Sequence, residues 1–103
     1  MKSRLKNIVD TIVKAVRPQQ IILFGSRARK EHTSSSDYDL LVVKKGVKNE
    51  RLVSRRIHQA FFDKKIKEGI DVVVVGTDKL NLNKDNPYRI YSWALKEGKV
   101  LYG

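Results

Sequence analysis

The chain lacks cysteine altogether, and it contains only two prolines and six glycines among its 103 residues. Without cysteine there can be no disulfide framework and no thiolate metal site. No apolar run approaches the roughly 18 residues that a membrane-spanning helix needs. The N-terminal stretch is basic and amphipathic, and it lacks the apolar block and the cleavage site of a signal peptide. These absences predict a cytoplasmic protein with no membrane partner.

The composition is that of a globular protein, because 41% of the residues are apolar and helix breakers are few. A length of 103 residues predicts one domain that spans residues 1–103. The sequence contains no internal repeat and no linker.

The charge is strongly positive, with 22 Lys and Arg against 11 Asp and Glu, a net charge of +11. Such a surface favours polyanions: nucleic acid, nucleotide phosphates or an acidic partner protein. A soluble, lysine-rich surface explains the charge equally well. The basic residues are spread along the chain and form no compact block, so the charge alone does not favour nucleic acid as the partner.

Hydrophobic spacing and turn residues predict alternating helices and strands. Helices are expected over residues 5–16, 26–31, 51–62 and 88–96. Strands are expected over residues 20–24, 38–43, 69–76 and 99–102. Residues 77–80 are expected to form a short turn, and residues 32–36 a polar loop. Pro87 suits the first position of the last helix.

This order, α-β-α-β-α-β-α with a short terminal β, predicts an α/β (α+β) domain of two or three layers around a small sheet. The run 69–76 is apolar on both faces, so we expect it to be a central strand that is covered on both sides. The last strand, 99–102, is expected at an edge.

A glycine and a serine, Gly25 and Ser26, follow the first predicted strand. Backbone N–H groups in such a strand-to-helix turn can bind phosphate, and Arg27 or Arg29 can supply positive charge. A Gly-Ser turn by itself is more often simply a turn. The stretch is neither a P-loop nor a dinucleotide fingerprint, because the further glycines and the Lys-Ser/Thr ending are missing.

Two aspartates, Asp37 and Asp39, stand at the start of a predicted strand. Because side chains alternate along a strand, both point to one face and Tyr38 to the other. Carboxylates this close repel one another unless a cation lies between them. A frayed loop end with both carboxylates solvated is the structural alternative.

A third aspartate, Asp71, lies near the start of the most apolar strand. If this strand neighbours the one that carries Asp37 and Asp39, all three carboxylates can face one site. Carboxylates beside a phosphate-binding turn are the ligands that magnesium prefers, and two such ions could assist an in-line displacement at phosphorus.

Gly25-Ser26 followed by Asp37-Tyr38-Asp39 resembles the signature of the polymerase-beta-type nucleotidyltransferase superfamily. The stretches LFGSRAR, SSSDYDLLVV and IDVVVV occur in the family's order, and ALKEGKVLYG is similar to its C-terminal ending. Within the superfamily the chain resembles the minimal nucleotidyltransferases, which are stand-alone domains. The resemblance implies the nucleotidyltransferase fold with a small mixed sheet flanked by helices.

The resemblance also implies roles for individual residues. Gly25 and Ser26 would hold the terminal phosphates of the nucleotide. The metal ligands and catalytic residues would be Asp37, Asp39 and Asp71, with Asp71 as the base or orienter of the attacking hydroxyl. At least one of the two arginines, Arg27 and Arg29, would contact phosphate.

One residue departs from the family pattern, since Lys30 stands where the family often has glycine. This makes the loop less permissive but removes no catalytic group, so an active enzyme is still expected. The implied reaction moves AMP from ATP to a hydroxyl with Mg²⁺ as the cofactor, with two ions expected. Other donor nucleotides remain open.

Minimal nucleotidyltransferases are often paired with a helical HEPN-type ribonuclease toxin, and the resemblance implies an antitoxin that adenylylates a tyrosine of that partner. A small-molecule nucleotidyltransferase of the aminoglycoside type is one alternative, although the basic surface disfavours cationic acceptors. A non-catalytic module that neutralises a toxin by binding is another. The sequence leaves homo-oligomerisation open.

Overall fold

The computed structural model describes residues 3–30, 37–83, 85–86 and 89–103, and these ranges contain four helices and four strands. In chain order the elements are α1 (Ser3–Val16), β1 (Gln20–Phe24), β2 (Tyr38–Lys44), α2 (Glu50–Asp63), β3 (Ile70–Gly76), α3 (Thr77–Asn83), α4 (Ile90–Glu97) and β4 (Lys99–Tyr102). The α/β class that the sequence predicts is confirmed.

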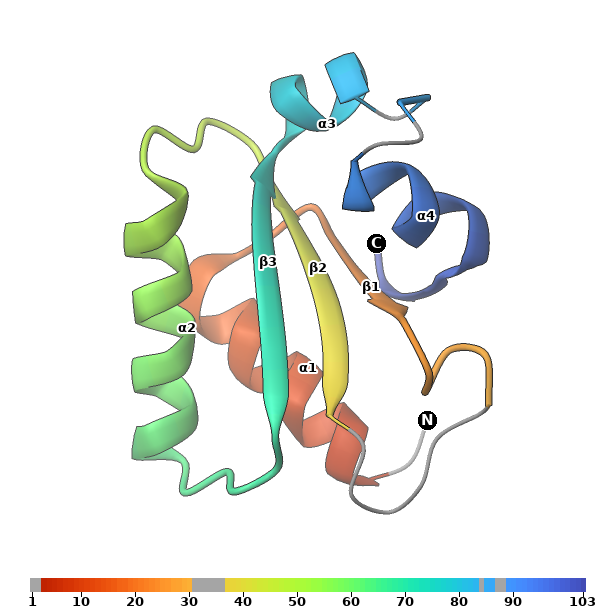
Figure 1. The fold of residues 1–103 in the computed structure, drawn as a ribbon. Helices are drawn as coiled ribbons and strands as arrows, with labels where there is room; N and C mark the ends of the chain where they lie inside the picture. The colour runs from red at the N-terminus through yellow and green to blue at the C-terminus, as the bar shows by residue number, and fades with distance from the viewer. Residues whose placement is uncertain (1–2, 31–36, 84, 87–88) are drawn as a thin grey trace.

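The strands form one mixed sheet in the order β3-β2-β1-β4 (Figure 1). β1 is antiparallel to both β2 and β4, whereas β2 and β3 are parallel and are connected through α2. β4 lies at an edge, as predicted, but β3 lies at the other edge, so its predicted central position is wrong. Apolar residues on both faces of a strand indicate cover above and below it, and they carry no information about its lateral neighbours.

Helices cover both faces of the sheet, which gives three layers (Figure 1). One core joins the sheet to α1 and α2, and the other joins it to α3 and α4. Consecutive residues of β2 belong to different cores because side chains alternate along a strand. Leu40 and Val42 lie in the first core, and Leu41 and Val43 in the second. All four are at most 2% exposed, so β2 is buried on both faces, and it is one of the two interior strands.

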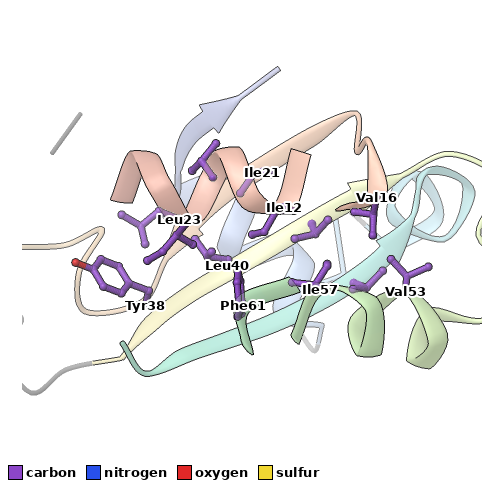
Figure 2. Packing of buried hydrophobic residues seen from close by; sticks show 13 residues of the cluster. Ile12, Val16, Ile21, Leu23, Tyr38, Leu40, Val53, Ile57 and Phe61 are labelled. Atoms are coloured by element: carbon purple, nitrogen blue, oxygen red, sulfur yellow. The ribbon is translucent and has the colours of Figure 1, made fainter. Parts of the chain in front are cut away.

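The core between the sheet, α1 and α2 is the larger of the two (Figure 2). Ile12 and Val16 of α1 meet Ile57 and Phe61 of α2 over Leu40 of β2. Burial of one such side chain contributes about 1.5–3 kcal/mol. This packing fixes β2 between its helices and therefore fixes the direction in which its other side chains point.

The ends of the two long helices follow local sequence signals. α1 ends at Val16, two residues before Pro18, as predicted. α2 begins at Glu50, where the Asn49 side chain accepts hydrogen bonds from the N–H groups of Arg51 (3.0 Å) and Leu52 (3.3 Å). No helix in the described ranges is long and apolar enough to cross a membrane.

The helix predicted over residues 26–31 is absent from its described part. Residues 26–30 form successive turns instead, and the N–H groups of Ala28 and Arg29 both donate to Gly25 O at 3.1 Å. Lys30 has φ 61°, a left-handed conformation that does not continue a right-handed helix. Glu31 and the predicted loop 32–36 lie outside the described residues.

Two predicted boundaries in the last third of the chain also change. The short turn expected over residues 77–80 is a helix, α3, which continues to Asn83, whose side-chain amide donates to Lys79 O at 2.8 Å. α4 begins at Ile90, with Arg89 as its N-cap, two residues later than predicted. Pro87 and Tyr88, which the sequence places at the helix start, lie outside the described residues.

We expect Gly98→Ala to lower the free energy of unfolding by about 1–3 kcal/mol, because a Cβ at this position overpacks the contact of α4 with β1. That Cβ would lie 2.2 Å from Ala94 O and 2.5 Å from Ile22 Cγ2. Urea denaturation measures the loss. The matched control is Gly76→Ala, whose Cβ would have its nearest contact at 3.7 Å, and an equal loss in both variants would contradict the prediction.

Candidate active site

The parallel pairing of β2 with β3 brings two of the predicted carboxylates together. Asp39 lies directly opposite Asp71 in the register, just as Tyr38 lies opposite Ile70. Neighbouring strands are about 4.8 Å apart, so residues at one register position share a face and lie side by side. The sequence predicts this arrangement only if the two strands are neighbours. The pairing of β2 with β3 meets this condition.

The third carboxylate, that of Asp37, lies just before β2. The N–H of Tyr38 donates to Gly69 O at 2.9 Å and so continues the pairing beyond the strand ends. A Cβ on Gly69 would lie only 2.1 Å from Asp37 Oδ1, so the carboxylate lies against the glycine backbone. Sequence reasoning missed Gly69, although it stands two residues before Asp71, just as Asp37 stands two before Asp39.

The Gly-Ser turn lies beside these carboxylates because β1 is antiparallel to β2. Phe24, the last residue of β1, is paired with Asp39, and Gly25 follows it. Gly25 has φ +75°, and a Cβ there would lie 2.2 Å from Asp39 Oδ2. Both the backbone conformation and the close approach of the carboxylate therefore require glycine at this position. Ser26 begins the turn that follows.

The carboxylates influence one another electrostatically. Burial raises the pKa of Asp39 above its ordinary value, the negative charges of Asp71 and Asp37 raise it further, and the positive charge of Arg29 lowers it. The ionised form of Asp39 is therefore disfavoured when no cation is bound. A bound divalent cation would reverse this effect.

The donor chemistry of the cluster fits a hard divalent cation. Asp37, Asp39 and Asp71 offer only carboxylate oxygens, the ligands that Mg²⁺ prefers together with water and phosphate oxygens. Within the described ranges, no group of three acidic, histidine or cysteine side chains is placed so that it could hold a metal ion, and Asp37, Asp39 and Asp71 together are no exception. Ligands from water and substrate would therefore have to complete the coordination.

The structure separates the two arginines of the turn. The Arg27 guanidinium carbon lies 4.0 Å from the centre of the Tyr38 ring, and Tyr38 belongs to the core on the α1 and α2 face. Arg29 Nη1 lies 3.6 Å from Glu97 Oε2 at the end of α4. Because Arg29 also lowers the pKa of Asp39, it is the arginine on the carboxylate face. Nothing in the sequence pointed to Glu97, since its contact depends on how α4 packs.

A cavity of about 630 Å³ lies elsewhere, at the opposite ends of β2 and β3, where α2 and α3 begin. It contains none of the predicted site residues. Lys79 and Glu50, which line it, pair with each other at 3.3 Å. The candidate site is instead at the N-terminal ends of the two parallel strands.

Comparison with known proteins agrees with the fold and with the motif. The family model described as polymerase beta, nucleotidyltransferase matches residues 6–103. The chain therefore belongs to the polymerase beta nucleotidyltransferase family, as its resemblance to that superfamily predicts. The comparison with curated proteins finds no match.

Two solved structures have a similar fold. One is a presumed nucleotidyltransferase from Sulfolobus solfataricus, with a TM-score of 0.64 and 24% identity over 94% of this chain and 75% of that one. The other is a toxin-antitoxin structure with AMP-PNP, with a TM-score of 0.59 and 20% identity over 95% of this chain and 73% of that one. Both likenesses support the mixed α/β nucleotidyltransferase fold.

We expect Lys30→Gly to raise the free energy of unfolding by about 0.5–1 kcal/mol. Lys30 has φ 61°, a conformation that costs a non-glycine residue roughly 1–2 kcal/mol. Glycine avoids this cost, although it loses more backbone entropy on folding, so the net gain is smaller. Urea denaturation measures the gain. Ser54→Gly, within α2, is the control and should be destabilising; a loss of stability in Lys30→Gly would show that its backbone is not strained.

We expect Asp39→Asn to raise the melting temperature of the metal-free protein at pH 7 by about 2–5 °C. The folded-state pKa of Asp39 is raised above 3.8, so its destabilising effect is absent below pH 3.8 and develops as the pH rises through the folded pKa. Calorimetry in EDTA at pH 3.5 and pH 7 measures both limits. The gain should vanish at pH 3.5, and the exposed Asp85→Asn control should show no such pH-dependent gain.

Proposed function

We propose that this protein is a magnesium-dependent protein adenylyltransferase that moves AMP from ATP to a tyrosine of a HEPN-type ribonuclease toxin and so acts as its antitoxin. Membership of the polymerase beta nucleotidyltransferase family supports nucleotidyl transfer as the reaction. The observation that carries the assignment of the site is the register of Asp39 with Asp71 beside the Gly25 turn.

In this proposal Asp37, Asp39 and Asp71 hold Mg²⁺. A bound ion would supply positive charge that favours ionisation of the acceptor hydroxyl and stabilises the charge of the leaving pyrophosphate. The raised pKa of Asp39 supports this role, since the cluster has charge to be neutralised.

The nucleotide lies with its terminal phosphates at the turn after β1. The N–H groups of Gly25 and Ser26 and the Ser26 hydroxyl donate to phosphate oxygens there. Arg29 adds positive charge on the carboxylate face, and Glu97 positions it. Arg27, which stacks on Tyr38, is the less suitable of the two arginines for phosphate contact.

The transfer step is an in-line displacement at the α-phosphorus. The acceptor oxygen forms a new P–O bond, the bond to the β-phosphate oxygen breaks, and pyrophosphate leaves. Asp71 orients the acceptor hydroxyl and accepts its proton. Residues 1–103 thus act as one minimal nucleotidyltransferase domain, which we place in the cytoplasm.

The nature of the acceptor is supported by likeness alone. One structure with a similar fold is a toxin-antitoxin with AMP-PNP, an analogue of ATP, which supports both an adenine nucleotide and a protein partner. The resemblance to minimal nucleotidyltransferases adds the HEPN-type partner and its tyrosine.

Transfer of label from [α-³²P]ATP to the product of the adjacent open reading frame tests this function. We expect transfer with Mg²⁺ and none in EDTA, and we expect Asp37→Ala and Asp39→Ala each to reduce the rate at least about 100-fold. Asp85→Ala, a change of the same charge outside the site, should leave the rate unchanged. Mass spectrometry should find the AMP on a tyrosine.

Other outcomes identify the alternatives. Toxin neutralisation that survives in Asp37→Ala and Asp39→Ala, with no label transferred, would indicate inhibition by binding alone. Transfer to a small hydroxyl compound but not to the protein would indicate a small-molecule nucleotidyltransferase. Either result would reject the protein adenylyltransferase.

A further inference from the structure

The fold gathers positive charge on one side of the molecule. Residues 44–67 contain nine Lys and Arg but only two Asp and Glu, which gives this segment +7 of the total +11. The segment comprises the last residue of β2, the helix α2 and the connections at both of its ends. Figure 1 shows α2 and these connections as one side of the molecule, in the layer that covers one face of the sheet. The basic residues of this continuous segment therefore lie on one side of the fold.

The arginines of α2 are exposed and unpaired within the described structure. Arg51, Arg55 and Arg56 point away from the core, and no described residue forms an ion pair with any of them. The two acidic residues of the segment have other partners: Glu50 pairs with Lys79 at 3.3 Å, and Asp63 accepts a hydrogen bond from Gln59. The charge of this surface is thus left for an external anion.

An exposed aromatic ring lies on the same helix face. Arg51, Arg55, His58 and Phe62 are spaced four, three and four residues apart, which places them along one side of α2. Phe62 is 77% exposed, while its neighbour Phe61 is buried in the core. This side of α2 therefore combines two arginines with a solvent-facing ring, and the exposed Arg56 lies one residue further round the helix.

This combination fits single-stranded nucleic acid better than an acidic protein. Arginine forks bind phosphate, and an exposed aromatic side chain offers a platform on which an unpaired base can stack. A protein interface of ordinary size would need a larger apolar centre than Phe62 and the half-exposed Leu52 provide.

We propose that the outer face of α2 binds single-stranded nucleic acid, with Arg51, Arg55 and Arg56 on backbone phosphates and Phe62 under a base. α2 packs on the face of the sheet opposite to Asp39 and Asp71. Nucleic-acid binding and nucleotidyl transfer therefore use different surfaces. A variant can lose one activity and keep the other, so the two proposals are tested separately.

Fluorescence anisotropy with a fluorescein-labelled 20-nucleotide single-stranded RNA tests the proposal. We expect binding whose logarithm falls linearly with the logarithm of salt concentration. Each contact with a phosphate of a single strand contributes roughly 0.7 to the magnitude of the slope. Arg51→Gln/Arg55→Gln/Arg56→Gln should therefore reduce this magnitude by about 2, and the affinity at 100 mM salt by about 100-fold. Phe62→Ala should weaken binding about tenfold.

A charge-matched control is Arg89→Gln/Lys96→Gln/Lys99→Gln, which removes three exposed cations from the other side of the molecule and should bind RNA as the unaltered protein does. Circular dichroism and the nucleotidyl transfer assay check that each variant is folded. Absence of binding at 50 mM salt, or equal loss in both triple variants, would overturn the proposal. Equal affinity for duplex with no effect of Phe62→Ala, or tighter binding of poly-glutamate than of RNA, would also overturn it.

Discussion

The register between β2 and β3 is the constraint on which the candidate site depends. It places Asp39 directly beside Asp71. Because side chains alternate along a strand, a slip of one residue would turn Asp39 into the core and Leu40 out of it. The opposed burial of Leu40 and Leu41 in two separate cores therefore maintains the carboxylate pair.

This packing has to act against repulsion within the site itself. The pKa of Asp39 is raised because the residue is partly buried and lies near Asp71 and Asp37, and Arg29 offsets only part of this effect. Arg29 can lie near Asp39 because the sheet is mixed. Since β1 is antiparallel to β2, its C-terminal end and the turn that carries Arg29 reach the N-terminal ends of the parallel strands. A wholly parallel sheet would place that turn at the opposite end.

Much of the site was accessible from the sequence because it depends on local spacing. Two aspartates two residues apart share a face of any strand, and a glycine after a strand indicates a turn. The contact with Asp71 could be stated only conditionally, since it requires knowledge of which strands are neighbours. The division between Arg27 and Arg29 was not accessible, because it depends on the path of the turn and on the position of Glu97 in α4.

The errors in the predicted fold have a similar origin. Lys30 adopts a left-handed conformation that its residue type does not indicate. A right-handed helix, which the sequence predicts after Gly25, cannot continue through this residue. The apolar run that forms β3 indicates that helices cover both of its faces. It does not indicate the position of β3 in the order of strands. The excess of basic residues in segment 44–67 is present in the sequence, but its position away from the carboxylates follows from tertiary structure.

The edge position of β3 has a consequence for access. In a central strand, Asp71 would be flanked by a further strand, and an acceptor could approach it only from above the sheet. At the edge, Asp71 is exposed, and none of the described strands pairs with the outer side of β3. In the proposed reaction, a tyrosine that projects from the surface of a folded protein could therefore approach sideways, with its own backbone remaining outside the sheet. The same geometry gives little enclosure to a small molecule, which would need walls on more than one side.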